Sequence, residues 1–289
     1  MNEKVTLSKI EVENLIKQNK DLSNKDLKNT NLSNIYLVNA KLKNVNFQKA
    51  DLSEASLFRA NLSGSNMFKA NLKNANLKNA NLSNVNLLGA NLDGTKLENV
   101  YWGKDNKVIN ELEAEELYIQ GKFDESNSKY REAEEVYRSI KISMQSQTLG
   151  DDTGKFFIRE MICKRKQFKK FSTARIGSKI IEITTGYGEK LSNIIFTIIG
   201  IIIVCMLLYG IEGISYQDKV IGFLSDDFSF SRTLGNLLYF SVVVYSTVGF
   251  GEMVPIGPIG KIIMMFEGIM GGLVLAILII ALYKKTMDR

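Results

Sequence analysis

A five-residue period runs through the first hundred residues of this 289-residue chain. From Leu22 to Leu97 every fifth residue is apolar, and 14 of these 16 residues are leucine. The residue two places earlier is most often alanine, and the other positions hold mainly Asn, Asp, Ser and Lys. A period of five matches neither an α-helix, at about 3.6, nor a β-strand, at about 2. It fits a coil with four short sides, each of which turns one large and one small residue inward, so that stacked coils bury a continuous leucine column.

The repeated segments, such as ANLKN and ANLSN, resemble the pentapeptide-repeat family, whose pattern is Ala-(Asp/Asn)-Leu-x-x. The resemblance covers residues 20–102 and implies a right-handed quadrilateral β-helix as the fold of this domain. Lys20, Lys25 and Ile35 stand where the pattern has alanine, which predicts a looser first coil. Asparagines at matching outward positions are expected to form ladders along the stack.

The open ends of such a stack need caps. Apolar residues with helical spacing in Thr6–Lys17 predict a capping helix within residues 1–19. At the other end the predicted cap is Trp102, followed by an acidic helix over Asn110–Gln120. Because the repeat carries 11 Lys/Arg against 6 Asp/Glu, acidic mimicry of DNA is not expected. Two roles stay open: a rigid scaffold for assembly, and a receptor through which an unknown cytoplasmic ligand or protein regulates the rest of the chain.

A helical hairpin is predicted over Asp124–Phe171, because apolar residues recur there at helical spacing. The two helices are expected to meet at a turn that begins at Leu149. Gly150 is the predicted C-terminal stop of the first helix, and Asp152 or Thr153 is the predicted N-cap of the second.

The predicted cytoplasmic linker, residues 103–188, ends in a basic juxtamembrane segment. Between Lys155 and Lys190 there are ten basic residues and three acidic ones. Nucleic-acid binding is one interpretation, but the position just before an apolar span favours a flank held by anionic lipids of the inner leaflet. We therefore expect no nucleic-acid partner. Residues 172–188 are predicted to run along that leaflet and to couple the hairpin to the first span.

Residues 189–289 contain two stretches that predict membrane spans. Leu191–Ile211 is 21 residues without a charge, long enough at about 1.5 Å per residue to cross a hydrocarbon core of about 30 Å. A second span is predicted over residues 262–283, interrupted only by Glu267. Basic residues before the first span and after the second predict a multi-pass protein of the plasma membrane with both termini in the cytoplasm. The loop between the spans then lies outside, and its acidic excess predicts a vestibule that concentrates cations. Its charged residues are Glu212, Asp218, Lys219, Asp226, Asp227, Arg232 and Glu252.

This loop holds the decisive motif, Thr-Val-Gly-Phe-Gly at residues 247–251. It directly follows an apolar stretch, residues 233–246, that is too short to span the membrane and long enough for a half-membrane helix. Two glycines at alternate positions allow backbone angles with which successive carbonyls point the same way. Four copies around an axis can replace the hydration shell of K⁺, so we expect a homotetramer.

The region resembles the two-transmembrane potassium channels, whose filter reads Thr-Val-Gly-(Tyr/Phe)-Gly-Asp. The resemblance covers about Leu191–Tyr283 and implies an all-α, two-transmembrane pore-loop domain that conducts K⁺ without a cofactor. The K⁺-binding residues that it implies, through backbone carbonyls, are Thr247, Val248, Gly249 and Phe250, and Gly251 completes the filter. The implied filter supports are Tyr239, Phe240 and Glu252, and the implied gating hinge is Gly271 with Gly268 and Gly272. Phe250 and Glu252 replace the commoner Tyr and Asp, and both departures bear on how stable the filter is.

Glu267 is unusual because an ionisable residue inside a span is costly and is by default a functional candidate. It lies one turn before Gly271, and its predicted partners are Ser241, Tyr245 or Ser246 on the pore helix. The alternative is a protonated group with a structural role. If Glu267 is functional, Glu267→Gln alters the open probability or the stability of the filter.

The composition excludes several classes of enzyme active site. The chain has no histidine, so a Ser-His-Asp triad, a Cys-His dyad and an imidazole-ligated metal are all absent. The two cysteines, Cys163 and Cys205, do not form a disulfide framework. An Arg-rich span and a Gly-rich nucleotide fingerprint are also missing, which argues against voltage sensing and a Rossmann-type sensor. We therefore expect a potassium channel and not an enzyme. The alternatives are a weakly selective cation channel and a membrane-anchored scaffold with a vestigial pore.

Overall fold

The computed structural model describes residues 7–18, 21–147, 150–225 and 229–287. The chain divides into two compact units, one that extends to Lys179 and one from Ile180 to Met287, and each is described by itself. Five residues named in the sequence analysis lie outside the described residues: Thr6, Lys20, Leu149, Asp226 and Asp227.

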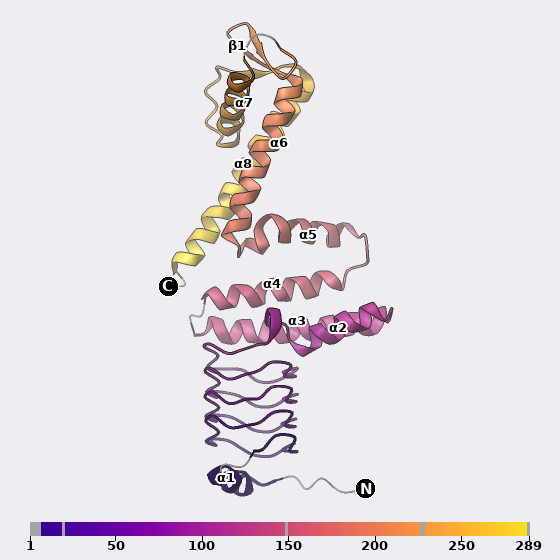
Figure 1. The fold of residues 1–289 in the computed structure, drawn as a ribbon, viewed down its shortest axis with the longest axis vertical. Coiled ribbons are helices and arrows are strands. Elements are labelled where there is room, and N and C mark those ends of the chain that lie inside the picture. The colour runs from indigo at the N-terminus through magenta and orange to yellow at the C-terminus, as the bar shows by residue number, and fades with distance from the viewer. Residues whose placement is uncertain (1–6, 19–20, 148–149, 226–228, 288–289) are drawn as a thin grey trace. The chain divides into compact units, whose positions relative to one another are not determined.

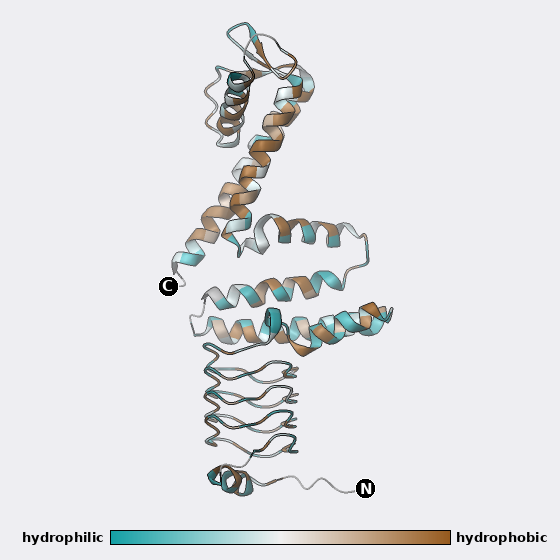
Figure 2. Ribbon diagram, in the orientation of Figure 1, coloured by the Kyte–Doolittle hydropathy of each residue, from teal (hydrophilic) through white to brown (hydrophobic). Residues whose placement is uncertain are grey.

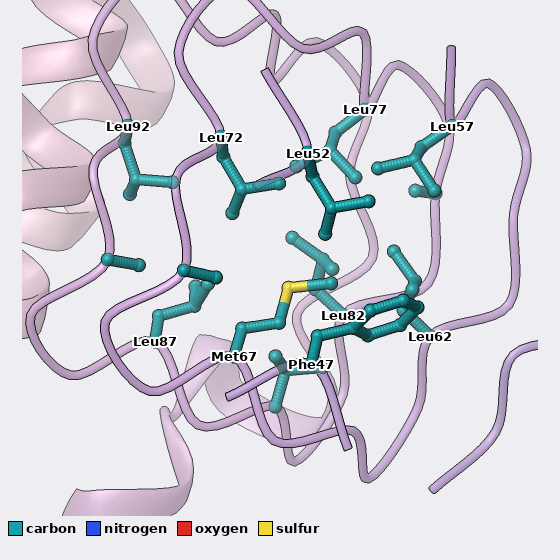
Figure 3. Close-up of a cluster of buried hydrophobic side chains, with 14 of the residues drawn as sticks. Phe47, Leu52, Leu57, Leu62, Met67, Leu72, Leu77, Leu82, Leu87 and Leu92 are labelled. Atoms are coloured by element: carbon teal, nitrogen blue, oxygen red, sulfur yellow. The ribbon is translucent and has the colours of Figure 1, made fainter. Parts of the chain in front are cut away.

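The repeat forms a stack of coils in which parallel bridges join residues 20 positions apart, from Asp26 with Asn46 to Asn81 with Tyr101 (Figure 1). Each coil therefore takes four five-residue repeats. The main chain bonds from coil to coil, as where the Leu52 amide donates to the Asn71 carbonyl at 2.7 Å. All 16 residues of the leucine column are at most 4% exposed, and Figure 3 shows those from Phe47 to Leu92 inside the coils. The stack of coils around a buried leucine column, predicted from the five-residue period, is therefore present.

The asparagines of the repeat have a conformational role. The residue two places after each column leucine has a positive φ, such as 63° at Asn24 and 57° at Asn74. Asparagine occupies this left-handed region more readily than most residues, so the turns between the sides favour it. Other asparagines form the expected ladder, as where the Asn71 side chain donates to the Asp51 carboxylate at 2.9 Å.

Helix α1, Lys9–Lys17, covers one end of the stack (Figure 1). It begins after Ser8, whose side chain and that of Glu11 form a capping box, and it buries Val12 completely. The Lys9 ammonium donates to the Ser33 carbonyl at 2.6 Å. The helix predicted over Thr6–Lys17 is therefore present from Lys9 onward.

The other end of the stack continues into helices. Trp102 is buried and its ring meets that of Phe156 edge-on, with centroids 5.1 Å apart. After a short 3₁₀ turn, Lys104–Asn106, come α2, Ile109–Ile119, α3, Phe123–Gln145, and α4, Gly150–Lys166. Helices α3 and α4 pack side by side as the predicted hairpin (Figure 1). The apolar residues that they bury are Tyr130, Ala133, Val136, Tyr137, Ile140, Met144, Phe156 and Cys163.

The predicted N-cap of the second hairpin helix is wrong. Helix α4 already begins at Gly150, so Asp152 and Thr153 lie inside its first turn. A carboxylate there is favourable because it faces the positive end of the helix dipole. Asp152 also pairs with Lys155, one turn later, at 2.7 Å.

A buried polar cluster joins α2 to the hairpin. Glu111 is 1% exposed, and it accepts a hydrogen bond from the Tyr137 hydroxyl and pairs with Arg159 at 3.3 Å. Burial raises the pKa of the Glu111 carboxyl, and the hydrogen bond and the guanidinium only partly oppose this.

Helix α5, Thr173–Thr185, connects the two units. In the second unit follow a 3₁₀ turn, Gly186–Gly188, then α6, Leu191–Glu212, β1, Ile214–Tyr216, β2, Lys219–Ile221, α7, Phe230–Tyr245, β3, Val254–Pro255, and α8, Gly257–Met287. Helices α6 and α8 are long and apolar enough to cross a membrane, and both are brown along most of their length in Figure 2. Only 28% and 17% of their most apolar windows are buried in the single chain, unlike the core helices of a soluble protein.

The expectation of an all-α pore domain is wrong in one respect. The strands form a small antiparallel sheet in the order β2-β1-β3, in which Ile214 pairs with both Ile221 and Pro255. Gln217 and Asp218, with φ of 48° and 62°, make the two-residue turn between β1 and β2. Strands this short leave no alternating pattern in the sequence, so the sheet was not predicted.

Candidate functional site

Helix α7 packs against both apolar helices. One of its faces is buried with Cys205, Met206 and Tyr209 of α6 and consists of Leu237, Phe240, Ser241 and Val244. The Phe240 ring meets the Tyr209 ring edge-on, with centroids 4.8 Å apart. The predicted pore helix, residues 233–246, therefore corresponds to a helix that begins one turn earlier and ends at Tyr245.

The TVGFG segment leaves α7 as irregular backbone. Thr247, Gly249 and Gly251 have φ of 58°, 56° and 75°, so the left-handed conformation recurs at alternate residues. A β-branched residue at positive φ is an outlier, and such outliers mark segments whose conformation the surroundings impose. Between them Val248 and Phe250 are 56% and 62% exposed in the single chain. The rest of the chain therefore does not cover this loop.

The structure separates the predicted filter supports. Phe240 is 4% exposed, inside the contact between α6 and α7, whereas its neighbour Tyr239 is 43% exposed on another face of α7. Glu252 is exposed directly after the loop, and Met253 beyond it is buried. Of the three predicted supports, only Phe240 is therefore buried within the single chain.

Glu267 is fully buried and links three helices. It accepts hydrogen bonds from the Tyr209 hydroxyl of α6, at 2.9 Å, and from the Ser241 hydroxyl of α7. Ser241 also lies 2.9 Å from the Ile202 carbonyl of α6. The carboxyl group of α8 therefore ties the pore helix to both long helices.

Among the three partners predicted for Glu267, Ser241 is the one that the described structure brings into contact. The Ser246 hydroxyl donates to the Val243 carbonyl at 3.1 Å, and the Tyr245 hydroxyl is buried without a partner among the described residues. Tyr209 was missed. Its signal in the sequence was a phenol inside an otherwise apolar span.

Gly271 lies where α8 crosses the end of α7. A Cβ atom on Gly271 would stand 2.1 Å from the carbonyl oxygen of Tyr245, which is the last residue of α7. Gly268 and Gly272 have no atom within 4 Å of their Cβ positions in the same chain. The structure thus assigns Gly271 a close packing contact, which is independent of its predicted role as a hinge.

Family comparisons agree with this arrangement. Residues 210–287, which include α7, the TVGFG segment and α8, match the ion-channel family, and residues 21–64 and 60–99 match the pentapeptide repeats, in eight copies. The chain joins a pentapeptide-repeat domain to an ion-channel domain of the two-transmembrane type. Ion channels of this family are oligomeric in general, the match and the two apolar helices together indicate a membrane protein, and neither family is enzymatic in general.

Solved structures resemble the repeat domain. The pentapeptide repeat protein Rfr23 from the cyanobacterium Cyanothece 51142 is 45% identical over 31% of this chain and 60% of its own, with a TM-score of 0.30. HetL from the cyanobacterium Nostoc sp. strain PCC 7120, a pentapeptide repeat protein involved in heterocyst differentiation regulation, is 34% identical over 28% of this chain and 38% of its own, with a TM-score of 0.28. The chain therefore spans less than two thirds of the length of both. No curated protein matches it.

Proposed function

We propose that the protein is a potassium-selective channel in which K⁺ permeates passively through a filter of residues 247–251. The observation that carries the proposal is the alternating left-handed backbone of TVGFG, which starts at the end of α7 between two apolar helices. The carbonyls of Thr247, Val248, Gly249 and Phe250 are the proposed ion ligands, and the Thr247 hydroxyl joins the innermost site. In four copies they replace the water that K⁺ loses on entry.

The proposed assembly is a homotetramer, because one chain supplies a quarter of such a filter. The exposure of Val248 and Phe250 supports it, since both leave an apolar surface that neighbouring copies would cover. We place the channel in the plasma membrane with both termini in the cytoplasm, and anionic lipids against the basic segment before α6. Lys284, near the end of α8, pairs with Glu189, just before α6. The start of α6 and the end of α8, which both carry basic flanks, therefore lie close together.

Tyr239, Phe240 and Glu252 stay the proposed supports of the filter. We add Glu267 and Gly271, because both contact α7 and α7 leads directly into Thr247. The hinge role of Gly271, with Gly268 and Gly272, stays part of the proposal and adds to the packing contact described above.

We propose that the repeat domain is a rigid, right-handed quadrilateral scaffold for assembly or regulation. Its support is the 20-residue spacing of the bridges together with the continuous buried column. The domain boundaries proposed with it are 1–19, 20–102, 103–188 and 189–289.

Liposomes that contain the purified full chain test the proposal. K⁺-driven flux without Na⁺-driven flux supports it. Equal fluxes indicate a weakly selective cation channel, and no flux from an intact tetramer indicates a scaffold with a vestigial pore; either result overturns it.

Two variants make the assay specific to the filter. Gly249→Ala places a side chain at a φ of 56° inside the filter, and we expect it to abolish K⁺ flux. Gly257→Ala is the matched control, because Gly257 has a φ of 71° with open space around it but lies outside the filter. We expect that variant to conduct.

A further inference from the structure

The first unit contains a cavity of about 320 Å³, and part of its lining comes from the basic segment identified in the sequence. It lies where the junction of α2 and α3, the end of α4 and the start of α5 meet. Its lining residues come from four separate segments, namely Tyr118, Phe123, Ser126, Asn127, Tyr130, Lys166, Gln167, Phe168, Lys169, Lys170 and Arg175.

The lining is strongly cationic. Lys166, Lys169, Lys170 and Arg175 contribute four positive charges, and no carboxylate lines the cavity. In the described part of the chain none of these four side chains forms an ion pair. The Arg175 guanidinium donates to the Phe168 carbonyl at 3.0 Å, and the Lys166 ammonium lies over the Tyr118 ring. Like charges gathered in this way repel one another unless an anion lies between them.

The helix dipole explains only part of this charge. Basic residues in the last turn of a helix are favourable, and Lys164, Arg165 and Lys166 occupy the last turn of α4. Lys169 and Lys170 follow the helix, and Arg175 belongs to the next one. The dipole of α4 therefore does not account for the convergence of the four cations on one cavity.

The lining also contains aromatic rings. The rings of Tyr118 and Phe123 meet edge-on, with centroids 5.3 Å apart, and Phe123 is 60% exposed. The Lys166 ammonium lies 5.8 Å from the centre of the Tyr118 ring. Phe168 completes the apolar part of the lining. The cavity thus combines cationic side chains with aromatic rings, and at Lys166 and Tyr118 the two are in contact.

We propose that this cavity binds a small organic phosphate with a planar ring, of the size of a nucleoside monophosphate. The phosphate pairs with Arg175 and the lysines, and the ring lies against Phe123 and Tyr118. A volume of about 320 Å³ lies at the lower end of the range for ligand sites, roughly 300–1,000 Å³, which favours a mononucleotide over a dinucleotide. Arg is suited to phosphate because its planar fork donates two parallel hydrogen bonds.

Ligand binding at this cavity regulates the pore through α5. Arg175 lies in the first turn of α5, and the same helix continues to Thr185 in the unit that contains α6 and α8. A ligand that bridges Arg175 to the end of α4 fixes the connection between these helices. This regulatory part rests on the proposed channel function, whereas the binding itself does not.

Calorimetric titration of the full chain in neutral detergent tests the binding, with the four common nucleoside 5′-monophosphates and inorganic phosphate as probes. We expect at least one nucleotide to bind more tightly than inorganic phosphate. Lys169→Gln and Arg175→Gln each weaken that binding about tenfold, as the loss of one charged hydrogen bond predicts. Phe123→Leu weakens nucleotide binding but leaves inorganic phosphate unchanged, because it removes the ring and keeps the apolar volume.

Lys164→Gln is the matched control, because Lys164 is an exposed lysine of the same helix that does not line the cavity. The proposal is overturned if no nucleotide binds, or if Lys164→Gln weakens binding as much as Lys169→Gln. It is also overturned if the binding of phosphatidylglycerol vesicles depends on Lys169 and Arg175 and the binding of nucleotides does not. The occupant of the cavity is then a lipid headgroup.

K⁺ flux with and without the bound nucleotide separates regulation from conduction. We expect the nucleotide to change the flux of the unsubstituted chain and of Lys164→Gln, and to have little effect on Arg175→Gln. If the channel proposal fails, no protein conducts although calorimetry still shows binding. If only the regulatory part fails, all of them conduct equally with and without nucleotide.

Discussion

Gly271→Ala tests how tightly α8 must approach the pore helix. The added Cβ atom would stand 2.1 Å from the carbonyl oxygen of Tyr245, 3.0 Å from the carbonyl carbon and 3.3 Å from the Cα of the same residue. Because Cβ atoms do not approach other atoms closer than about 3 Å, the end of α7 or the facing turn of α8 has to move by about 1 Å. Tyr245 is two residues before Thr247, so the displacement reaches the entrance of the proposed filter.

The energetic effect is the difference of two terms. Overpacking costs about 1–3 kcal/mol, and replacing glycine by alanine inside a helix gains up to about 1 kcal/mol. With the full helix gain, we therefore expect Gly271→Ala to destabilise the protein by up to about 2 kcal/mol, which lowers the melting temperature by up to roughly 8 °C. Gly272→Ala gains the helix term without the clash, because its Cβ position is open in the chain.

The assay compares both variants with the unsubstituted chain, by thermal melting in detergent and by K⁺ flux in liposomes. We expect Gly271→Ala to melt lower and to lose flux, and Gly272→Ala to melt at the same temperature or higher. Equal melting temperatures for the two variants would refute the packing argument. Normal melting together with loss of flux in both variants would favour a purely flexible hinge.

Two further predictions concern buried carboxyl groups. Glu267→Gln replaces one acceptor oxygen by a donor facing the Tyr209 or Ser241 hydroxyl, so we expect an altered open probability in single-channel recordings or a less stable tetramer. If both stay unchanged, Glu267 has no role in supporting the filter. Burial raises the pKa of Glu111, so the folded chain keeps a proton that the unfolded chain releases near pH 4.5. Its contribution to stability is therefore present below that pH and is lost as the pH rises toward the folded pKa. We expect urea unfolding of Glu111→Gln to depend less on pH in this window than that of Glu116→Gln, an exposed control on the same helix, and equal slopes would contradict the assignment.

Features with a short repeat or a contiguous motif could be predicted from the sequence. The leucine column was predictable because each coil repeats the same local geometry, so one five-residue unit carries the information for the whole stack. The two apolar helices were predictable from length and charge, with ends that differ by a few residues from those expected. The ends of helices are harder to predict than the helices themselves. The helical pattern runs on through Ser8, and it is the capping by Ser8 that makes α1 begin at Lys9.

Features that depend on distant contacts could not be predicted in the same way. Glu267 and Tyr209 are 58 positions apart, and no periodicity connects them. Strands β1, β2 and β3 contain two or three residues each, and only their mutual pairing gives them extended form.

The two kinds of domain can be recognised from the chain alone, because a five-residue period and an uncharged 21-residue stretch each constrain it locally. The roles of individual polar and small residues follow from contacts between distant segments. Folding places the Tyr245 carbonyl against Gly271 and hydroxyl donors beside Glu267, and it brings Arg175 and the lysines after α4 to one cavity with aromatic rings. Packing contacts and charge clusters depend on distances in space, which sequence spacing fixes only within a single helix, turn or coil.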